Sequence, residues 1–129
     1  MLRSGILNPQ INSLLSRVRH TNTLVIADRG FPNFPNIETV DLSLVDDIPR
    51  VLDVLRAVRF NFVIGRITMA EEFRLHNTPA VIGDFARTMV DVELQFELHT
   101  EFKKRVPQAI GLIRTGDTTQ YANMILESS

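Results

Sequence analysis

The sequence has no cysteine and no tryptophan among its 129 residues. Without cysteine, the chain has no thiol nucleophile, no disulfide framework and no cysteine–metal site. The absence of cysteine also fits the cytoplasm, where disulfides are rare. Thiol chemistry and disulfide-rich secreted folds are therefore excluded.

The sequence also lacks a strong charge of either sign, since 14 basic and 15 acidic residues leave a formal net charge of −1. Such a balance gives no long-range field that attracts nucleic acid or an anionic membrane. No apolar run reaches the roughly 20 residues needed to cross a bilayer. The first residues have no apolar signal core and no cleavage site. The sequence therefore predicts a cytoplasmic protein that binds neither nucleic acid nor membrane.

Motifs of the easily recognised enzyme classes are absent. No G-x-G-x-x-G follows a strand, there is no Walker loop, and there is no G-x-S-x-G nucleophile elbow. The three histidines, His20, His76 and His99, are too scattered to form a local metal motif. Asp28 at a strand end suggests a phosphoacceptor receiver-like domain, but no acidic residue that could hold Mg²⁺ precedes it. We therefore expect neither a metal nor a cofactor.

Short β-rich apolar runs alternate along the chain with apolar residues at helical spacing. The expected helices cover residues 9–20, 46–58, a short stretch around 71–72, 78–89 and 100–107. The expected strands cover residues 24–27, 37–42, 61–69, 92–98, 109–114 and 122–126. The pattern predicts one α/β domain over residues 1–129, a layered fold with a mixed β-sheet flanked by helices. We expect a mixed sheet because the last two strands lie close together in sequence, joined across a turn at Gly116.

Several polar residues have structural roles predicted by their position. The Asn8-Pro9 pair is typical of a helix start, and one residue of the Asp46-Asp47 pair is expected to cap the second helix. The Glu71-Glu72 pair is interpreted as helix-surface charge, because adjacent helical residues point in different directions. His76 stands at a helix end and is interpreted as structural or capping.

Asp28 and His20 flank the most apolar strand, residues 24–27. Ligands of layered α/β sheets sit beyond the carboxyl ends of strands, and Asp28 is the first residue after this one. Asp28 alternatively forms a turn through bonds to local N–H groups. His20 ends the preceding helix, where a cation also interacts favourably with the helix dipole. Position alone leaves open whether the two residues form a site.

Two further groups of residues suggest a ligand site. His99 and Lys103 are four residues apart, a spacing that can bring both side chains to one mouth of the fold. Tyr121, Ala122 and Asn123 place a hydroxyl, an amide and backbone groups in a row, which suits a polyhydroxy ligand. Each group has a structural alternative: a solvated helix start for the first, and a tyrosine that anchors the last strand for the second.

Taken together and in order, segments along the whole chain resemble the D-ribose pyranase / L-fucose mutarotase family, with D-ribose pyranase as the nearer member. Residues 20–32 (H-T-N-T-L-V-I-A-D-R-G-F-P) resemble its H-T-D-T-L-V-V-x-D-A-G-x-P signature. Residues 70–77 resemble its A-E-E … H-N segment, and residues 99–103 resemble H-x-x-F-K. Residues 114–117 and 121–126 resemble its closing R-T-G-E and Y-A-N-I-I-L.

The resemblance implies a sugar isomerase that interconverts the pyranose and furanose forms, and the anomers, of D-ribose or a related free sugar. It implies that His20 is the catalytic acid/base. The residues that it implies hold the sugar are Asp28, His99, Lys103, Tyr121, Ala122 and Asn123. Ring opening needs a base for the anomeric hydroxyl proton and an acid for the ring oxygen, and the family implies no metal or cofactor. The family also implies a homo-oligomer, typically a decameric ring, in which a neighbouring chain completes each site at the subunit junction.

The sequence departs from the family pattern beside these positions. Asn22 replaces an acidic residue, Arg29 replaces a small one, Gln120 replaces a proline, and the loop at residues 30–35 is one residue longer. These changes leave the preferred sugar open, and we hypothesise that Arg29 recognises a different or additionally charged sugar. Two other functions stay open: an L-fucose-type mutarotase, which changes anomers rather than ring size, and a catalytically silent sugar-binding module.

Overall fold

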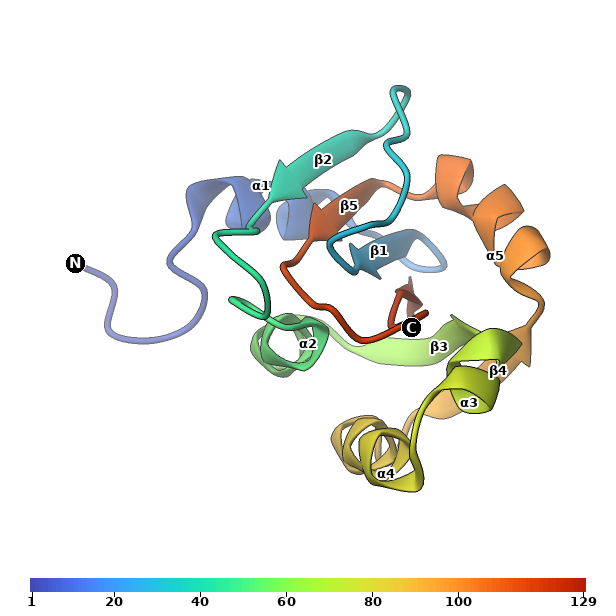
Figure 1. Cartoon of the computed structure of the whole chain (residues 1–129). Coiled ribbons are helices and arrows are strands. Elements are labelled where there is room, and N and C mark those ends of the chain that lie inside the picture. The colour runs from blue at the N-terminus through green and yellow to red at the C-terminus, as the bar shows by residue number, and fades with distance from the viewer.

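Six strands form one mixed sheet with helices on both faces in the computed structural model, which describes all 129 residues (Figure 1). In chain order the elements are α1 (Pro9–Arg17), β1 (Thr23–Ala27), β2 (Glu38–Asp41), α2 (Val51–Arg59), β3 (Ile64–Ala70), α3 (Glu71–His76), α4 (Pro79–Thr88), β4 (Glu93–Glu97), α5 (His99–Arg105), the 3₁₀ turn η1 (Val106–Gln108), β5 (Gly111–Arg114) and β6 (Met124–Ser128). The predicted α/β fold, with a mixed sheet flanked by helices, is confirmed.

The strand order in the sheet is β2-β5-β1-β6-β3-β4. β6 runs antiparallel to both of its neighbours, β1 and β3, whereas the other neighbouring strands run parallel. The last two strands are close in sequence but do not pair, because β1 lies between them. The carboxyl ends of five strands therefore meet at the same edge of the sheet as the start of β6.

Strand β1 is buried on both faces, as its unbroken apolar sequence predicts. Leu24 and Ile26 point to one face and pack in a core built with α1, α2 and α4. Val25 and Ala27 point to the other face and pack in a smaller core built with α5 and η1. Helix α5 accordingly lies across the sheet from α2 and α4 (Figure 1). Full burial of each large apolar side chain stabilises the fold by about 1.5–3 kcal/mol.

Helix α1 begins where the sequence predicts and ends earlier. Asn8 caps it, since the Asn8 side-chain oxygen accepts a hydrogen bond from an N–H of the first helical turn at 2.9 Å. The helix ends at Arg17 rather than at His20. The side-chain oxygen of Asn22 accepts from the N–H of Arg19 at 2.9 Å and closes a turn. His20 therefore lies in this turn, outside the helix.

The N-terminus of α2 is capped by a residue from a distant part of the chain. Arg50 is the N-cap residue, and its N–H donates to Asp53 at 2.8 Å. The N–H of Val51, the first helical residue, donates to the carboxylate of Asp117 at 2.9 Å, across 66 positions in sequence. Asp117 is only 2% exposed, and its other oxygen accepts from the N–H of Thr119 at 2.8 Å. This buried carboxylate therefore joins α2 to the segment between β5 and β6.

The prediction that Asp46 or Asp47 caps α2 is wrong. Asp46 pairs instead with Arg29, with 2.6 Å between guanidinium and carboxylate. Asp47 accepts hydrogen bonds from the N–H and the hydroxyl of Thr118, at 2.9 and 2.8 Å. The reason is that the chain between β2 and α2 first crosses the carboxyl edge of the sheet, where it meets the loops that follow β1 and β5.

Several strand boundaries also differ from the predictions, and β5 begins at Gly111, two residues later than predicted. β3 begins at Ile64 because the N–H groups of residues 61–62 both donate to the carbonyl of Val58 and extend the end of α2. β6 begins at Met124, two residues later than predicted, so Ala122 and Asn123 stand just before it. None of the helices has the length and apolar composition needed to cross a membrane.

Two glycines let neighbouring elements approach β5 closely. A Cβ atom on Gly116 would lie 2.3 Å from the carbonyl oxygen of Val45 and 3.0 Å from that of Ile48. A Cβ atom on Gly111 would lie 2.6 Å from the side chain of Leu14 in α1. The loop after β2 and helix α1 therefore occupy positions that any side chain at these glycines would obstruct.

Candidate functional site

Polar residues gather at the edge of the sheet where β1 and β4 end and β6 begins. Asp28 is the first residue after β1, and His99 opens α5 shortly after β4. Tyr121, Ala122 and Asn123 precede β6, which reaches the same edge because it runs antiparallel to its neighbours. The topology thus brings together three groups that are far apart in sequence.

Asp28 is fixed through both its backbone and its carboxylate. The N–H of Asp28 donates to the side-chain oxygen of Asn123 at 2.7 Å. A carboxylate oxygen of Asp28 accepts from the N–H of Gly30 at 3.0 Å. Burial raises the pKa of the Asp28 carboxyl above 3.8, and repulsion from Asp117 adds a little, while hydrogen bonds donated to the carboxylate oppose the rise. The result is a carboxyl group that keeps its proton to higher pH than an exposed aspartate does.

His99 sits in an aromatic surrounding at the start of α5. Its ring stacks on Phe102, with the ring centres 6.0 Å apart, and meets Tyr121 edge-on at 5.1 Å and Phe31 edge-on at 6.1 Å. The backbone N–H of His99 donates to both carboxylate oxygens of Glu72, at 3.0 and 3.1 Å. The ring and the backbone of His99 are therefore both held in place.

The environment of His99 favours its neutral form. Burial lowers the pKa of His99 below 6.5, and the positive charge of Lys103 lowers it further, while the charges of Glu72 and Asp28 act in the opposite direction. Nδ1 of His99 is buried and makes no hydrogen bond within the chain. A second ring proton would leave a buried donor unpaired, which is costly. The predicted proximity of His99 and Lys103 at one mouth of the fold agrees with this electrostatic coupling.

The Tyr121–Asn123 segment forms the wall of the site next to Asp28 and His99. Ala122 and Asn123 are buried, and the half-buried Tyr121 has a left-handed backbone with φ of 55°. The ring of His76 stacks on that of Tyr121, with the ring centres 5.5 Å apart. The Asn123 amide has its oxygen bonded to the Asp28 N–H, and a hydrogen bond from the Asn123 side chain is among those that oppose the rise of the Asp28 pKa.

Three residues of this edge were given no site role by the sequence analysis. Glu72 was interpreted as surface charge but holds the N–H of His99, and His76 was interpreted as structural but contacts Tyr121. The guanidinium of Arg114 donates to the carbonyl oxygens of Asp28 and of the next residue, at 3.4 and 3.3 Å. The contacts of these residues could not be predicted from local patterns, because their partners lie far away in sequence. The only indication of a role was that they fall in the family-like A-E-E … H-N and R-T-G segments.

His20 does not join these residues within one chain. It lies in the turn before β1, whereas Asp28 follows β1, and the strand alone is roughly 15 Å long. The neighbouring N–H of Thr21 donates to the carbonyl of Ser128 at 3.0 Å, which places the turn beside the end of β6. Asn123 stands at the start of β6. His20 and the Asp28 cluster therefore lie at opposite edges of the sheet.

Arg29 lies beside the candidate site and is exposed. Its guanidinium forms an ion pair with Asp46 at 2.6 Å, in which both side chains are more than half exposed. Its backbone N–H donates to the carbonyl of Asp117 at 3.1 Å. An exposed ion pair of this kind contributes at most about 1 kcal/mol to stability. A ligand can therefore displace Asp46 from Arg29 at little cost in free energy.

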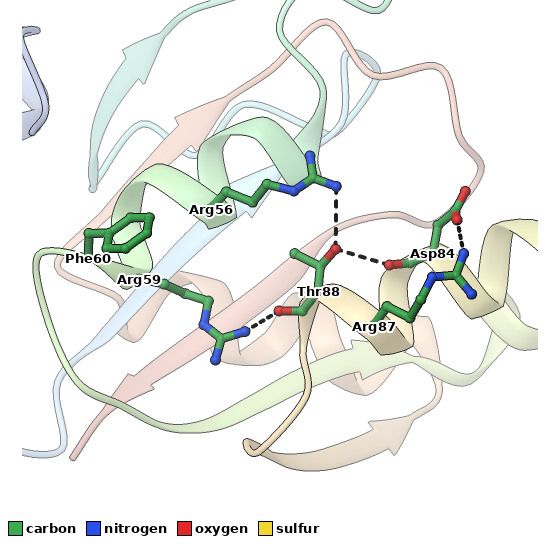
Figure 2. Close-up of a pocket in the computed structure, with 6 residues that line it drawn as sticks. All are labelled: Arg56, Arg59, Phe60, Asp84, Arg87 and Thr88. Carbon is green, nitrogen blue, oxygen red and sulfur yellow. Dashed lines mark hydrogen bonds and ion pairs between the residues drawn. The ribbon is translucent and has the colours of Figure 1, made fainter.

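A separate groove of about 590 Å³ lies between α2 and α4 (Figure 2). Its lining residues are Arg56, Arg59, Phe60, Asp84, Arg87 and Thr88. Arg59 donates to the carbonyl oxygens of Thr88 and Val90, and Arg87 pairs with Asp84. The groove contains none of the predicted site residues. Arg59 joins α2 to the end of α4, whereas the Arg87–Asp84 pair lies within α4.

No group of three or more His, Asp and Glu side chains is placed to hold a metal ion together. The chemical groups at the edge of the sheet are instead a carboxyl, an imidazole, an ammonium, a phenol and a carboxamide. This combination can donate and accept many hydrogen bonds and can transfer protons near neutral pH.

Comparison with protein families gives a match over residues 1–129 to a family described as the RbsD / FucU transport protein family. A D-ribose pyranase of Geobacillus thermodenitrificans is 46% identical over 129 residues, which cover 99% of this chain and 96% of the relative. A D-ribose pyranase of Bacillus cytotoxicus is 36% identical over 128 residues, which cover 99% of this chain and 97% of the relative.

Solved structures give the same picture for the fold. Bacillus subtilis RbsD complexed with D-ribose superposes with a TM-score of 0.92 at 29% identity, covering 100% of this chain and 98% of that one. A fucose mutarotase of Streptococcus pneumoniae in complex with L-fucose superposes with a TM-score of 0.84 at 17% identity, covering 99% of this chain and 98% of that one. At 17% identity the second likeness concerns the fold alone.

Proposed function

The chain belongs to the RbsD / FucU transport protein family, and from this we propose that it is an isomerase that interconverts the pyranose and furanose forms of D-ribose or a related free sugar. The same ring opening also exchanges the anomers. The observation that carries the proposal is the full-length likeness to D-ribose pyranases, at up to 46% identity. The ligand of the RbsD structure, D-ribose, supports a free monosaccharide as the substrate.

The cluster at the carboxyl edge of the sheet suits the recognition of such a sugar. A free pentose carries several hydroxyl groups and no charge, so its binding depends on many directed hydrogen bonds. Asp28 would accept from a sugar hydroxyl, Tyr121 and the NH₂ group of Asn123 would donate, and Lys103 would donate from the adjacent turn of α5. Ala122 lies between two of these residues and would contribute backbone groups.

The reaction passes through the open-chain aldehyde. A base removes the proton of the anomeric hydroxyl while an acid protonates the ring oxygen, and the reverse process recloses the ring on a different hydroxyl or face. We assign His20 as the catalytic acid/base, because an imidazole can give or take a proton near neutral pH. The surroundings of His99 favour its neutral form. His99 would therefore bind the sugar without adding a positive charge to that of Lys103.

Because His20 lies at the opposite edge from Asp28, the proposed mechanism requires a second copy of this chain. We infer a homo-oligomer in which the turn that carries His20 reaches the Asp28 edge of the next subunit. Such a head-to-tail contact uses two different surfaces and closes into a ring when the rotation allows it. A decameric ring remains the specific prediction for the assembly, and the cytoplasm remains the predicted location.

Saturation-transfer NMR on D-ribose tests the proposed reaction, because it reports which ring forms and anomers exchange. The wild type should accelerate pyranose–furanose exchange, and His20→Ala should lower the rate by about 10²–10⁴-fold. Asp84→Asn in the groove between α2 and α4 serves as a control and should behave as the wild type. Unchanged exchange in His20→Ala would refute the assignment of His20.

The same measurement on other sugars separates the remaining functions. Exchange between anomers of L-fucose without exchange between ring sizes of ribose would indicate an L-fucose-type mutarotase instead. Binding of sugars without any acceleration would indicate a silent binding module, and the proposed reaction would then be wrong.

The sugar preference depends, in our proposal, on Arg29. Its ion pair with Asp46 is exposed and lies beside Asp28, so an anionic group on a sugar could replace the Asp46 carboxylate. Binding of ribose, fucose and sugar phosphates to the wild type and to Arg29→Ala tests this. Arg29→Ala should lose affinity for sugar phosphates while its affinity for uncharged sugars stays unchanged. Identical binding profiles of the two proteins would overturn the role of Arg29.

A further inference from the structure

We propose that His76 and Asn77, at the C-terminal end of α3, are positioning residues that fix the direction of the Tyr121 side chain in the sugar site. This inference rests on the proposed function and extends it, because it adds α3 to the elements that build the site. Neither residue is proposed to touch the sugar.

Tyr121 needs outside support for its conformation. Its φ of 55° lies in the left-handed region, which is unfavourable for a residue with a side chain. Such conformations persist where the surroundings fix them, and they are frequent at ligand sites. Tyr121 also lies outside any helix or strand, so no regular backbone ladder holds it.

Asn77 supplies the backbone part of this support. Its side-chain NH₂ group donates to the carbonyl oxygen of Gln120, the residue before Tyr121, at 2.9 Å. The same nitrogen donates to the carbonyl of Phe73 at 2.8 Å, and Phe73 is buried in the core. Asn77 therefore ties the start of the Tyr121 segment to a rigid part of α3.

His76 supplies the side-chain part. Its ring lies nearly parallel to that of Tyr121, at 5.5 Å and 29°, while His99 meets the same tyrosine edge-on at 5.1 Å and 80°. One imidazole from α3 and one from α5 therefore contact the phenol ring. These two contacts restrict both the position and the plane of the ring. The position of the ring places the phenol oxygen, and the O–H bond lies preferentially in the ring plane.

The contact of His76 does not serve the core, which is the ordinary reason for an aromatic pair. His76 is exposed, and it is absent from both buried clusters of the fold. Its removal therefore leaves the packing of the core intact. Its removal instead increases the conformational freedom of the Tyr121 side chain.

The intrinsic fluorescence of the protein comes from Tyr121, since it is the only tyrosine and the chain has no tryptophan. Tyrosine fluorescence of the full-length protein, titrated with D-ribose, therefore reports on this one side chain. We expect ribose to change the emission of the wild type. His76→Ala should alter the emission of the free protein and weaken the response to ribose.

Kinetics of three variants complete the test. His76→Ala should lower kcat/KM about 3- to 10-fold, mainly through a higher KM, as expected for loss of an aromatic contact. His76→Phe keeps the stacked ring without its nitrogens and should stay within about twofold of the wild type. Leu75→Ala, at an exposed neighbouring position of α3, is the matched control and should leave both the kinetics and the emission unchanged.

Two results would overturn the inference while leaving the proposed function intact. One is an active His76→Ala variant with wild-type KM and wild-type emission. The other is a His76→Phe variant as defective as His76→Ala, which would mean that the imidazole nitrogens act on the sugar directly. Absence of any exchange activity in the wild type would instead refute the proposed function.

Discussion

At the scale of single residues, Asp28 and His99 have pKa values shifted by burial in directions that both favour the neutral form. A site that holds an uncharged sugar gains from neutral groups, because charged ones demand water or a counter-ion. The cost of keeping each charged form at this edge makes the stability of the fold depend on pH.

Asp28→Asn should stabilise the protein at neutral pH and reduce its activity. The folded state binds the Asp28 proton more tightly than the unfolded state, so the contribution of Asp28 to stability is lost as the pH rises above 3.8 through the folded-state pKa. Thermal unfolding from pH 4 to pH 8 checks this. The variant should have the higher Tm at pH 7–8, and the difference should shrink toward pH 4; a variant that is less stable at pH 7 would contradict the argument.

Two substitutions should move the pKa of His99 in opposite directions. Lys103→Met removes a positive charge and should raise the pKa of His99 toward 6.5, whereas Glu72→Gln keeps an acceptor for the His99 N–H and should lower it further. NMR titration of the imidazole signals measures both shifts, and the chain has only three histidines to assign. Shifts of the same sign in the two variants would be inconsistent with the proposed electrostatics.

His99 also links pH to stability. Because its folded-state pKa is lowered, the native state favours the neutral ring, and the corresponding stability is present above pH 6.5 and lost as the pH falls below it. Activity that depends on neutral His99 should therefore persist to a pH below 6.5.

At the scale of elements, the loops at the carboxyl edge hold the site together. Asp117 is the clearest case, since one carboxylate caps α2 through Val51 and the local turn through Thr119. Arg114 acts similarly, because its guanidinium bonds to carbonyl oxygens of the loop that begins at Asp28. The helices and the site are thus stabilised by the same contacts.

Asp117→Ala should destabilise the fold by about 2 kcal/mol, because it leaves the buried N–H of Val51 and the half-buried N–H of Thr119 without acceptors. Asp46→Ala removes an exposed ion pair and should cost less than about 1 kcal/mol. Urea unfolding of the two variants measures the difference. Equal costs would mean that Asp117 does not cap α2 in solution.

At the scale of the whole molecule, the sheet separates His20 from Asp28, and the proposed site needs two subunits. His20 lies at the amino end of β1 and Asp28 at its carboxyl end. A site that needs both must therefore draw them from different copies of the chain, and this can be tested without knowing the number of subunits.

Mixing two variants of low activity should restore activity. In oligomers assembled at random from equal amounts of His20→Ala and Asp28→Asn subunits, about a quarter of the sites combine an intact His20 with an intact Asp28 of the neighbour. Ribose exchange should accordingly return to about a quarter of the wild-type rate after co-refolding. Each variant refolded alone is the control, and mixtures as inactive as the separate variants would contradict a shared site.

The sequence by itself determined the features that depend on neighbours along the chain. The apolar run of β1, the Asn8 cap of α1 and the alternation of helices with strands were predicted, because caps and periodicity act over a few residues. Family membership was also predicted from the ordered segments, and the comparison with known families confirmed it.

Only the tertiary structure decided which distant residues meet. It placed the carboxylate of Asp117 on α2 in place of Asp46 or Asp47, and Glu72 on the N–H of His99. It also separated His20 from Asp28, which are near each other in sequence. The physical reason is the strand order. β6 lies between β1 and β3 and runs antiparallel to both, and no local pattern in the sequence predicts that position.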